Sequence, residues 1–234
     1  MLSVVIPTYN EAGYLGAALE ALAPQLRTED DVIVVDSFST DATVRIAEVH
    51  GARVLQMPRH GIGAAKALGM DASRAPVVGF LDADAVPARD WVARIKGHFA
   101  GPEVLAVAGL ALYGSDGAAR RATYNVFASG VWSLGAAGYA ILRVPWLPVN
   151  NCAFRKEVVA DRGGFRSVVC EDVDFAMRAR GLPGVVYDPG LRVTLSDRRF
   201  QSRSFLGQVL AWAHADLRVF LGRPFPTDGY GAPR

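Results

Sequence analysis

The sequence contains few cysteines. Cys152 and Cys170 are its two, and they stand in no metal-binding spacing such as CxxC. Because two cysteines form no disulfide framework, we expect two reduced and partly buried thiols, although a bridge between them stays open at this point. Internal repeats and low-complexity segments are also lacking. The N-terminus has no basic leader and passes directly into a strand pattern, so we expect no secretory signal peptide.

An excess of one charge is lacking too. The formal net charge is +2 at pH 7, which gives no argument for a nucleic acid partner, and we expect none. Hydrophobic residues make up 51% of the chain and charged residues 21%, a balance that excludes a disordered protein. With 234 residues the chain is long enough for one domain with a substantial core.

Long apolar runs are rare, and a single stretch comes close to the length of a membrane span. Residues 124–142 carry no charge over 19 positions. Asn125, Ser129, Ser133 and three glycines in this stretch weaken both membrane insertion and a continuous helix. We therefore predict a buried or interfacial helix that turns into a strand near Tyr139.

Short strands rich in Val and Ile alternate with helical patterns in the first hundred residues. We expect strands at 2–6, 32–35, 53–56 and 77–81, and helices at 12–26, 41–50, 61–74 and 90–99. Such alternation predicts an α/β fold with a Rossmann-like, mostly parallel central sheet flanked by helices. The later patterns are strands at 104–112 and 151–154, helices at 171–180 and 202–221, and a loose tail at 222–234.

Polar residues follow three of the expected strands where each strand ends. They are residues 7–11, Asp36, and the pair Asp82 and Asp84. The carboxyl ends of parallel strands meet at one edge of a sheet, where open α/β sheets bind ligands. Paired carboxylates suit Mg²⁺ or Mn²⁺, which commonly bridge to phosphates. The sequence therefore predicts a metal-bound diphosphate at this edge, with Asp36 available to a ribose hydroxyl or a base N–H.

Four further residues are candidates for the same site. Asn151 precedes a later strand, and we assign it to substrate binding. Lys66 lies one turn into the helix expected at 61–74, where its side chain either reaches a phosphate or is solvated. The segment resembles a phosphate-binding loop only weakly, because neither GxxxxGK[ST] nor GxGxxG is present. Glu171 and Asp172 stand at the start of an expected helix, and two interpretations are open. Acidic residues often stabilise a helix N-terminus. Alternatively, the pair supplies a general base that deprotonates an attacking hydroxyl.

Six segments in order resemble the inverting family 2 glycosyltransferases, which have the GT-A fold. They are VVIPTYNE at 4–11, VVDSFSTDAT at 34–43, GIGAAKALG at 61–69, FLDADA at 80–85, GGF at 163–165 and EDVDFAMRARG at 171–181. Within the family, the chain resembles the dolichyl-phosphate and archaeal membrane-associated mannosyl- or glucosyltransferases.

The resemblance implies a role for each matching residue. Asp82 and Asp84 would form the DxD motif that binds Mn²⁺ or Mg²⁺, with Asp84 the more direct ligand, and Asp172 would be the catalytic base. Arg199 and Phe200 partly match the RW of a Q/RxxRW motif, and Asp36-Ser37 departs from the family's usual two acids. The implied substrate-binding residues are Pro7, Thr8, Tyr9, Glu11, Asp36, Lys66, Asp82, Ala83, Asp84, Glu171 and Arg199.

The resemblance also implies a function. We expect a metal-dependent transfer of a hexose, with GDP-mannose ranked slightly ahead of UDP-hexoses, to a lipid-linked or membrane-proximal glycan at the cytoplasmic face of a membrane. Residues 1–200 would form the GT-A catalytic domain, and residues 201–234 an amphipathic, interfacial helix and tail. Two alternatives stay open: a nucleotidyltransferase, although residues 7–11 lack its Gly-rich loop, and an inactive module that binds a nucleotide-sugar or glycan.

Overall fold

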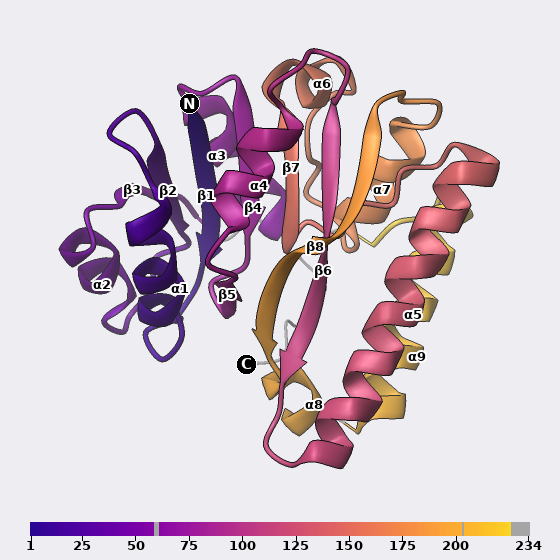
Figure 1. The fold of residues 1–234 in the computed structure, drawn as a ribbon. Helices are drawn as coiled ribbons and strands as arrows, with labels where there is room; N and C mark the ends of the chain where they lie inside the picture. The colour runs from indigo at the N-terminus through magenta and orange to yellow at the C-terminus, as the bar shows by residue number, and fades with distance from the viewer. Residues whose placement is uncertain (59–60, 203, 226–234) are drawn as a thin grey trace.

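The computed structural model describes residues 1–58, 61–202 and 204–225. A sheet of eight strands runs through the molecule in the order β3-β2-β1-β4-β7-β6-β8-β5, as Figure 1 shows. The strands are β1 (Leu2–Thr8), β2 (Asp31–Asp36), β3 (Arg53–Gln56), β4 (Val77–Leu81), β5 (Ala85–Pro87), β6 (Ala106–Gly114), β7 (Asn151–Arg155) and β8 (Val185–Ser196). The helices are α1 (Leu15–Leu22), η1 (Ala23–Gln25), α2 (Thr43–Val49), α3 (Ile62–Ala72), α4 (Trp91–His98), α5 (Ala118–Leu142), α6 (Lys156–Asp161), α7 (Glu171–Arg178), α8 (Arg198–Ser202) and α9 (Phe205–Phe220).

The first four strands form one continuous parallel part of the sheet. β1 pairs with β2 and with β4, and β2 pairs with β3, all in parallel. The chain runs outward from β1 to β2 and β3 and then returns, so that β4 lies on the other side of β1. Strand order therefore reverses between β1 and β4, and the crevice beyond their carboxyl ends is the expected ligand site of such a sheet. This confirms the prediction of an α/β fold with a mostly parallel sheet flanked by helices.

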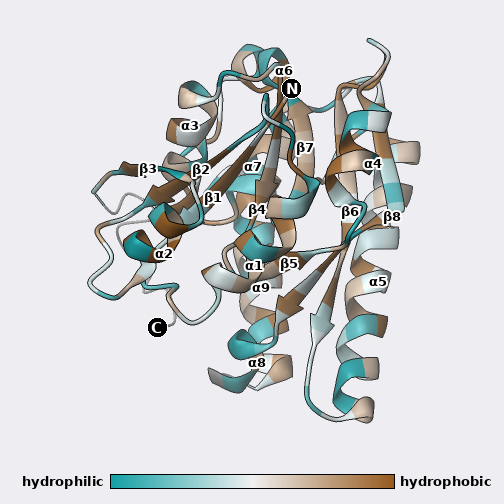
Figure 2. Cartoon of the chain, turned by 60° about the vertical axis from the view of Figure 1, so that its left-hand side comes forward, coloured by the Kyte–Doolittle hydropathy of each residue, from teal (hydrophilic) through white to brown (hydrophobic). Residues whose placement is uncertain are grey.

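Two apolar layers cover the two faces of the sheet. Side chains alternate along β1, so Val4 packs in the layer that α1 and α4 complete, and Val5 packs in the layer of α3, α6 and α7. Figure 2 shows the central strands largely in the brown of hydrophobic residues, with teal on the surrounding helices and loops. The helix α3 lies very close to the sheet, because a Cβ on Gly69 would overlap the side chains of Val5 and Val35.

Strand β8 has no counterpart among the strands expected from the sequence. Its middle reads Asp188-Pro189-Gly190, which has the composition of a turn. In the structure β8 runs parallel to β6 from 185 to 196, and the register shifts between Gly109 and Leu110 of β6. That bulge absorbs the Pro-Gly segment, so tertiary pairing overrides the local turn signal.

The expectation of a strand near Tyr139 is wrong. Helix α5 continues without a break to Leu142 and ends where Arg143 adopts a left-handed conformation, with φ of 55°. The Tyr139 hydroxyl donates a 2.8 Å hydrogen bond to the Leu182 carbonyl, which holds the last turn of the helix against the domain. The helix is not a core helix either, since Tyr124 and Tyr139 are the two of its residues that are buried.

The close approach of α3 to the sheet gives a stability test. Gly69→Ala places a methyl group against Val5 and Val35, so we expect the free energy of unfolding to fall by about 1–3 kcal/mol. Gly97→Ala is the matched control: its Cβ meets nothing within 4 Å, and alanine there should stabilise α4 by about 0.5–1 kcal/mol. Urea denaturation of both variants measures the difference; equal effects would contradict the packing.

Candidate functional site

The crevice between β1 and β4 is closed by an arginine held between two carboxylates. Glu11 follows β1, and Asp84 follows β4. Arg198, from the start of α8, donates from Nη1 and Nη2 to the two Glu11 oxygens at 2.6 and 2.8 Å. Its Nε lies 2.9 Å from Asp84 Oδ2, and its guanidinium stacks on the Tyr14 ring at 4.5 Å. The predicted metal and nucleotide carboxylates therefore share one cation.

The turn after β2 is braced by Asp36. The Asp36 carboxylate is fully buried and accepts hydrogen bonds from Thr8 Oγ1 at 3.2 Å and from the Ser39 amide at 2.9 Å. The Ser39 hydroxyl donates a further bond at 2.5 Å. The structure thus brings Thr8 and Asp36 together as predicted, but contact between Asp36 and a ribose requires this turn to move. Tyr9 lies more openly beyond β1, with 39% of its surface exposed.

The turn after β4 brings the Asp82 and Asp84 carboxylates into a crowded, largely buried site. The turn closes with a 3.0 Å hydrogen bond from the Ala85 amide to the Asp82 carbonyl, and Ala83 is buried. Burial raises the pKa of both carboxyls, and their mutual charge repulsion raises that of Asp82 further, while Lys66, Arg198 and Arg199 oppose the rise. The pair therefore favours a nearby cation.

Lys66 is tied to the start of α7. It is 1% exposed, and its Nζ lies 2.7 Å from Glu171 Oε1. Burial alone would lower the pKa of Lys66, but the charges of Glu171 and Asp82 raise it, so the ammonium stays protonated. The sequence placed both residues in the site; it did not show that they form a buried ion pair.

Asp172 has the properties of a base. Burial, the adjacent Glu171 charge and the Asp216 charge raise the pKa of Asp172 to about 7, against the pull of Lys66. A carboxyl with a pKa near neutrality is suited to accept and release a proton. Asp216 comes from α9, where it lies against the Cys170 thiol that precedes Glu171. Cys170 and the buried Cys152 are both free thiols.

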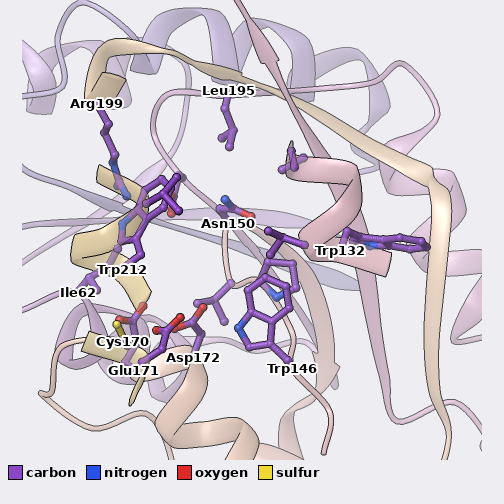
Figure 3. Close-up of a pocket in the computed structure, with 18 of the residues that line it drawn as sticks. Ile62, Trp132, Trp146, Asn150, Cys170, Glu171, Asp172, Leu195, Arg199 and Trp212 are labelled. Atoms are coloured by element: carbon purple, nitrogen blue, oxygen red, sulfur yellow. The ribbon is translucent and has the colours of Figure 1, made fainter. Parts of the chain in front are cut away.

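A cavity of about 500 Å³ joins these groups. Lys66, Asp82, Asp84, Glu171 and Asp172 line one side. The other side is apolar and comes mainly from α5, α9 and the 146–150 segment. Figure 3 shows Trp146 and Trp212 on either side of the carboxylates that open α7, with Trp132 farther out. Three of the four tryptophans of the chain, Trp132, Trp146 and Trp212, therefore line one cavity.

Two polar atoms of this cavity have no hydrogen-bond partner within the described part of the chain. They are Trp132 Nε1, a donor, and Asn150 Oδ1, an acceptor, and both are shielded from bulk solvent. Buried polar atoms are normally satisfied, so such a pair indicates where the polar groups of a bound molecule would be recognised.

The assignment of Asn151 to substrate binding is not supported. Asn151 is fully buried, and its amide donates to the carbonyls of Leu110 at 3.2 Å and Leu191 at 2.8 Å while accepting from Trp91 Nε1 at 2.7 Å. Two of these bonds join β7 to β6 and β8, and the third joins β7 to α4, so the side chain has a structural role. The neighbouring Asn150 reaches the cavity instead.

Several site residues escaped the sequence reasoning. Arg199 lines the cavity, and its neighbour Arg198 contacts the Glu11 and Asp84 carboxylates. Asp216 and Trp212 lie in a helical pattern that reads as amphipathic surface, and no local signal separates them from it. The pair Arg198-Arg199 was the available signal for Arg198, because adjacent residues of a short helix point to different sides and contact different groups.

The donor groups fit a divalent cation shared with a phosphate. Within the described residues no cluster of three or more His, Cys, Asp or Glu side chains forms an all-protein metal cage. Mg²⁺ and Mn²⁺ are commonly held by one or two carboxylates together with substrate phosphates, and Asp82 and Asp84 supply that donor set. The Arg198 guanidinium already shows that Asp84 attracts a cation.

Comparison with known proteins agrees with this geometry. The family model described as glycosyl transferase family 2 matches residues 3–163, from β1 through α6. The chain belongs to glycosyl transferase family 2. The pre-mycofactocin glycosyltransferase of Mycobacterium tuberculosis is 31% identical to this chain over 237 residues. The match covers 97% of this chain and 49% of that protein.

Solved structures confirm the GT-A fold. The mannosyltransferase PcManGT from Pyrobaculum calidifontis, in complex with GDP-Man and Mn²⁺, superposes with a TM-score of 0.64 at 26% identity, covering 82% of this chain and 56% of that one. The glucosyl-3-phosphoglycerate synthase of Mycobacterium tuberculosis, with Mn²⁺, UDP and glucosyl-3-phosphoglycerate, has a TM-score of 0.66 at 21% identity, covering 99% and 83%. The matched region spans only 36–49% of the length of the curated mycobacterial relatives.

The raised pKa of Asp172 predicts an effect of pH on stability. A carboxyl whose pKa is raised on folding binds more protons in the folded state than in the unfolded state. The stability of the wild type therefore falls as the pH rises from 3.8, the ordinary pKa of an aspartate, to about 7, the pKa of Asp172 in the folded protein. Asp172→Asn removes the buried charge, so we expect a higher melting temperature than wild type at about pH 8.5 and little change at about pH 5. Calorimetry at both pH values measures it. Asp71→Asn, at an exposed position of α3, is the control and should show no such difference.

Proposed function

We propose that this chain is the catalytic part of a nucleotide-sugar-dependent, inverting glycosyltransferase that transfers a hexose to a lipid-linked or membrane-proximal glycan acceptor. One observation carries the proposal: a single cavity joins the DxD carboxylates to Asp172. An enzyme of this class needs a diphosphate site and a base within one enclosed space, because the acceptor must attack the anomeric carbon as the diphosphate leaves.

The residues divide the chemistry between them. Asp172 accepts the proton of the attacking hydroxyl, and its pKa near 7 suits that exchange at neutral pH. Asp84 and Asp82 would hold Mn²⁺ or Mg²⁺, which when bound neutralises the charge of the departing diphosphate. Lys66 and Arg199 add positive charge on the cavity side. If the acceptor is a phosphate, it needs no deprotonation, and Asp172 positions it instead.

The donor is proposed from the chain's relatives. PcManGT is 26% identical to this chain, and its structure contains GDP-Man and Mn²⁺. This similarity supports ranking GDP-mannose slightly ahead of UDP-hexoses as the donor. The braced Asp36 turn lies where a nucleoside would be read. Its single acid, followed by Ser37, differs from the two acids common in the family and leaves either nucleotide compatible with the site.

The apolar wall of the cavity supports an acceptor with a hydrophobic portion. Val209, Trp212 and Ala213 of α9 face Phe127, Ala128 and Val131 of α5 across it. Burial of apolar surface in such a cavity contributes roughly 25 cal/mol per Å². Residues 1–200 would therefore supply the donor site and the base, while the segment from 201 onward completes the acceptor side. The tail 226–234 lies outside the described residues.

The outer surface of the same two helices supports contact with a membrane. Among the described residues, α5 has the length and hydropathy of a membrane-spanning helix. Its exposed apolar residues are matched by an exposed stripe on α9, and Figure 1 shows both helices outside the β6–β8 end of the sheet. Apolar helix faces with arginines nearby are typical of helices that lie at a lipid surface. The stripe on α9 consists of Leu206, Leu210, Leu217 and Phe220.

Transfer can be tested with the purified protein and a membrane extract as the source of acceptor. With Mn²⁺ and radiolabelled GDP-mannose or UDP-hexoses, we expect label in the lipid fraction and release of a nucleoside diphosphate. Asp172→Asn should lower the rate by about 10²-fold or more, because the base is lost, with nucleotide affinity retained. Asp84→Asn should instead weaken the binding of nucleotide in the presence of Mn²⁺.

Other outcomes would replace the proposal. Release of pyrophosphate in place of a nucleoside diphosphate would identify a nucleotidyltransferase. Binding of nucleotide by calorimetry with no transfer to any acceptor would identify an inactive binding module. Full transfer after removal of divalent metal would contradict the role given to Asp82 and Asp84.

Membrane contact is tested separately by co-sedimentation with vesicles that contain anionic lipid. We expect the protein to bind these vesicles, and the double variant Leu210→Glu/Leu217→Glu to bind at least about tenfold more weakly, because two charges replace apolar contacts. Val49→Glu, at an equally exposed position on α2 away from α5 and α9, is the control and should bind as wild type. Equal loss in both variants would contradict a surface formed by α9.

A further inference from the structure

Arg198 joins the turns that follow β1 and β4. Both of its terminal nitrogens bond Glu11, its Nε contacts Asp84, and its guanidinium lies on the Tyr14 ring. The side chain is nevertheless 29% exposed and comes from α8, a helix of only five residues. Its partners are less exposed, at 14% for Glu11 and 6% for Asp84, so these ion pairs lie at the edge of a largely buried site.

The same contacts place Arg198 in competition with a metal ion. Asp84 Oδ2 is 2.9 Å from the guanidinium, and that oxygen belongs to the carboxylate proposed as the direct metal ligand. Two cations on one carboxylate repel each other strongly in a partly buried site. A divalent cation on Asp84 therefore requires Arg198 to leave, or at least to loosen its contact with that oxygen.

A diphosphate offers Arg198 a new partner at the moment it is displaced. Guanidinium groups bind phosphate oxygens in the same forked geometry as carboxylates. The backbone near Arg198 is bonded to the turn after β4, because the Ser196 amide donates a 3.1 Å hydrogen bond to the Asp84 carbonyl. The side chain can therefore exchange partners by rotating while α8 keeps its attachment to the turn after β4.

We propose that Arg198 is an exchangeable counter-ion of the donor site, which neutralises Glu11 and Asp84 in the free protein and transfers to the diphosphate when the metal takes Asp84. This rests on the proposed function and assigns a positioning role to the residue that precedes Arg199, the arginine that partly matches the RW of the family motif. It makes the metal and the nucleotide bind cooperatively: the metal alone must displace Arg198 without compensation, whereas metal and diphosphate together give it a new bond.

The proposal predicts effects of opposite sign on two ligands. In Arg198→Gln, Mn²⁺ alone should bind about fivefold or more tightly than in wild type, because no guanidinium competes for Asp84. UDP or GDP in the presence of Mn²⁺ should bind about tenfold or more weakly, because a charge-assisted bond to the diphosphate is lost. Electron paramagnetic resonance of free Mn²⁺ measures the first affinity, and calorimetry the second.

Arg198→Lys separates competition from simple charge. Lysine keeps the positive charge but cannot bond Glu11 in a fork and contact Asp84 together. The counter-ion proposal expects tighter Mn²⁺ binding in this variant also, whereas a long-range charge effect leaves it at the wild-type value. Arg45→Gln, on α2 and outside the crevice, is the control and should change neither affinity. Circular dichroism melting of each variant checks that the fold is retained.

Two results would overturn the proposal. Unchanged Mn²⁺ affinity in folded Arg198→Gln means that the arginine does not compete for Asp84. Tighter Mn²⁺ binding in Arg198→Gln with wild-type affinity in Arg198→Lys means that charge alone is responsible. Failure of wild type to bind UDP or GDP with Mn²⁺ would instead count against the proposed function, and the Mn²⁺ titrations without nucleotide keep the two failures apart.

Discussion

The structure depends on the crowding of carboxylates where the parallel strands end and α7 begins. Glu11, Asp82, Asp84, Glu171 and Asp172 come from distant parts of the chain and meet around one crevice and cavity. Buried like charges are costly, and here Lys66 and Arg198 offset that cost with bonds of 2.6–2.9 Å. The raised pKa values of Asp82, Asp84 and Asp172 follow from the same crowding. This concentration of acidic groups supports the proposed metal site at Asp82 and Asp84 and the proposed base at Asp172.

The fold explains why these groups meet at that place. Strand order reverses between β1 and β4, so the turns after these strands flank one crevice. The antiparallel β7 then returns the chain along β4, and α7 delivers Asp172 to the adjacent cavity. Helices α5 and α9 add the apolar wall. The site thus has two parts: the proposed donor site and base, from the turns after β1 and β4 and the start of α7, and the proposed acceptor wall, from α5 and α9.

The sequence predicted the first of these parts well. Strands β3 and β4 have the expected bounds, and Asp82, Asp84, Glu171 and Asp172 line the cavity. Local patterns suffice to predict this part of the site. Short apolar strands are recognised from the sequence, and in a parallel sheet the polar turns that follow them lie at the same edge. The predictions failed where distant contacts decide the outcome. No strand was predicted at 185–196, where Asp188-Pro189-Gly190 has the composition of a turn, yet the segment pairs with β6. Asn151 was predicted as a site residue, but its amide bonds β7 to β6 and β8.

By itself the sequence determined the family, the fold class and the acids at the strand ends, because these follow from periodicity and from motifs in a fixed order. Tertiary structure alone decided which charges are paired. Arg198 and Arg199 are adjacent in the chain, yet Arg198 closes the crevice with Glu11 while Arg199 faces the cavity. Trp212 and Asp216 likewise belong to the cavity only because α9 packs against α7. Ion pairs and cavity walls depend on distances between remote segments, and no local pattern encodes those distances.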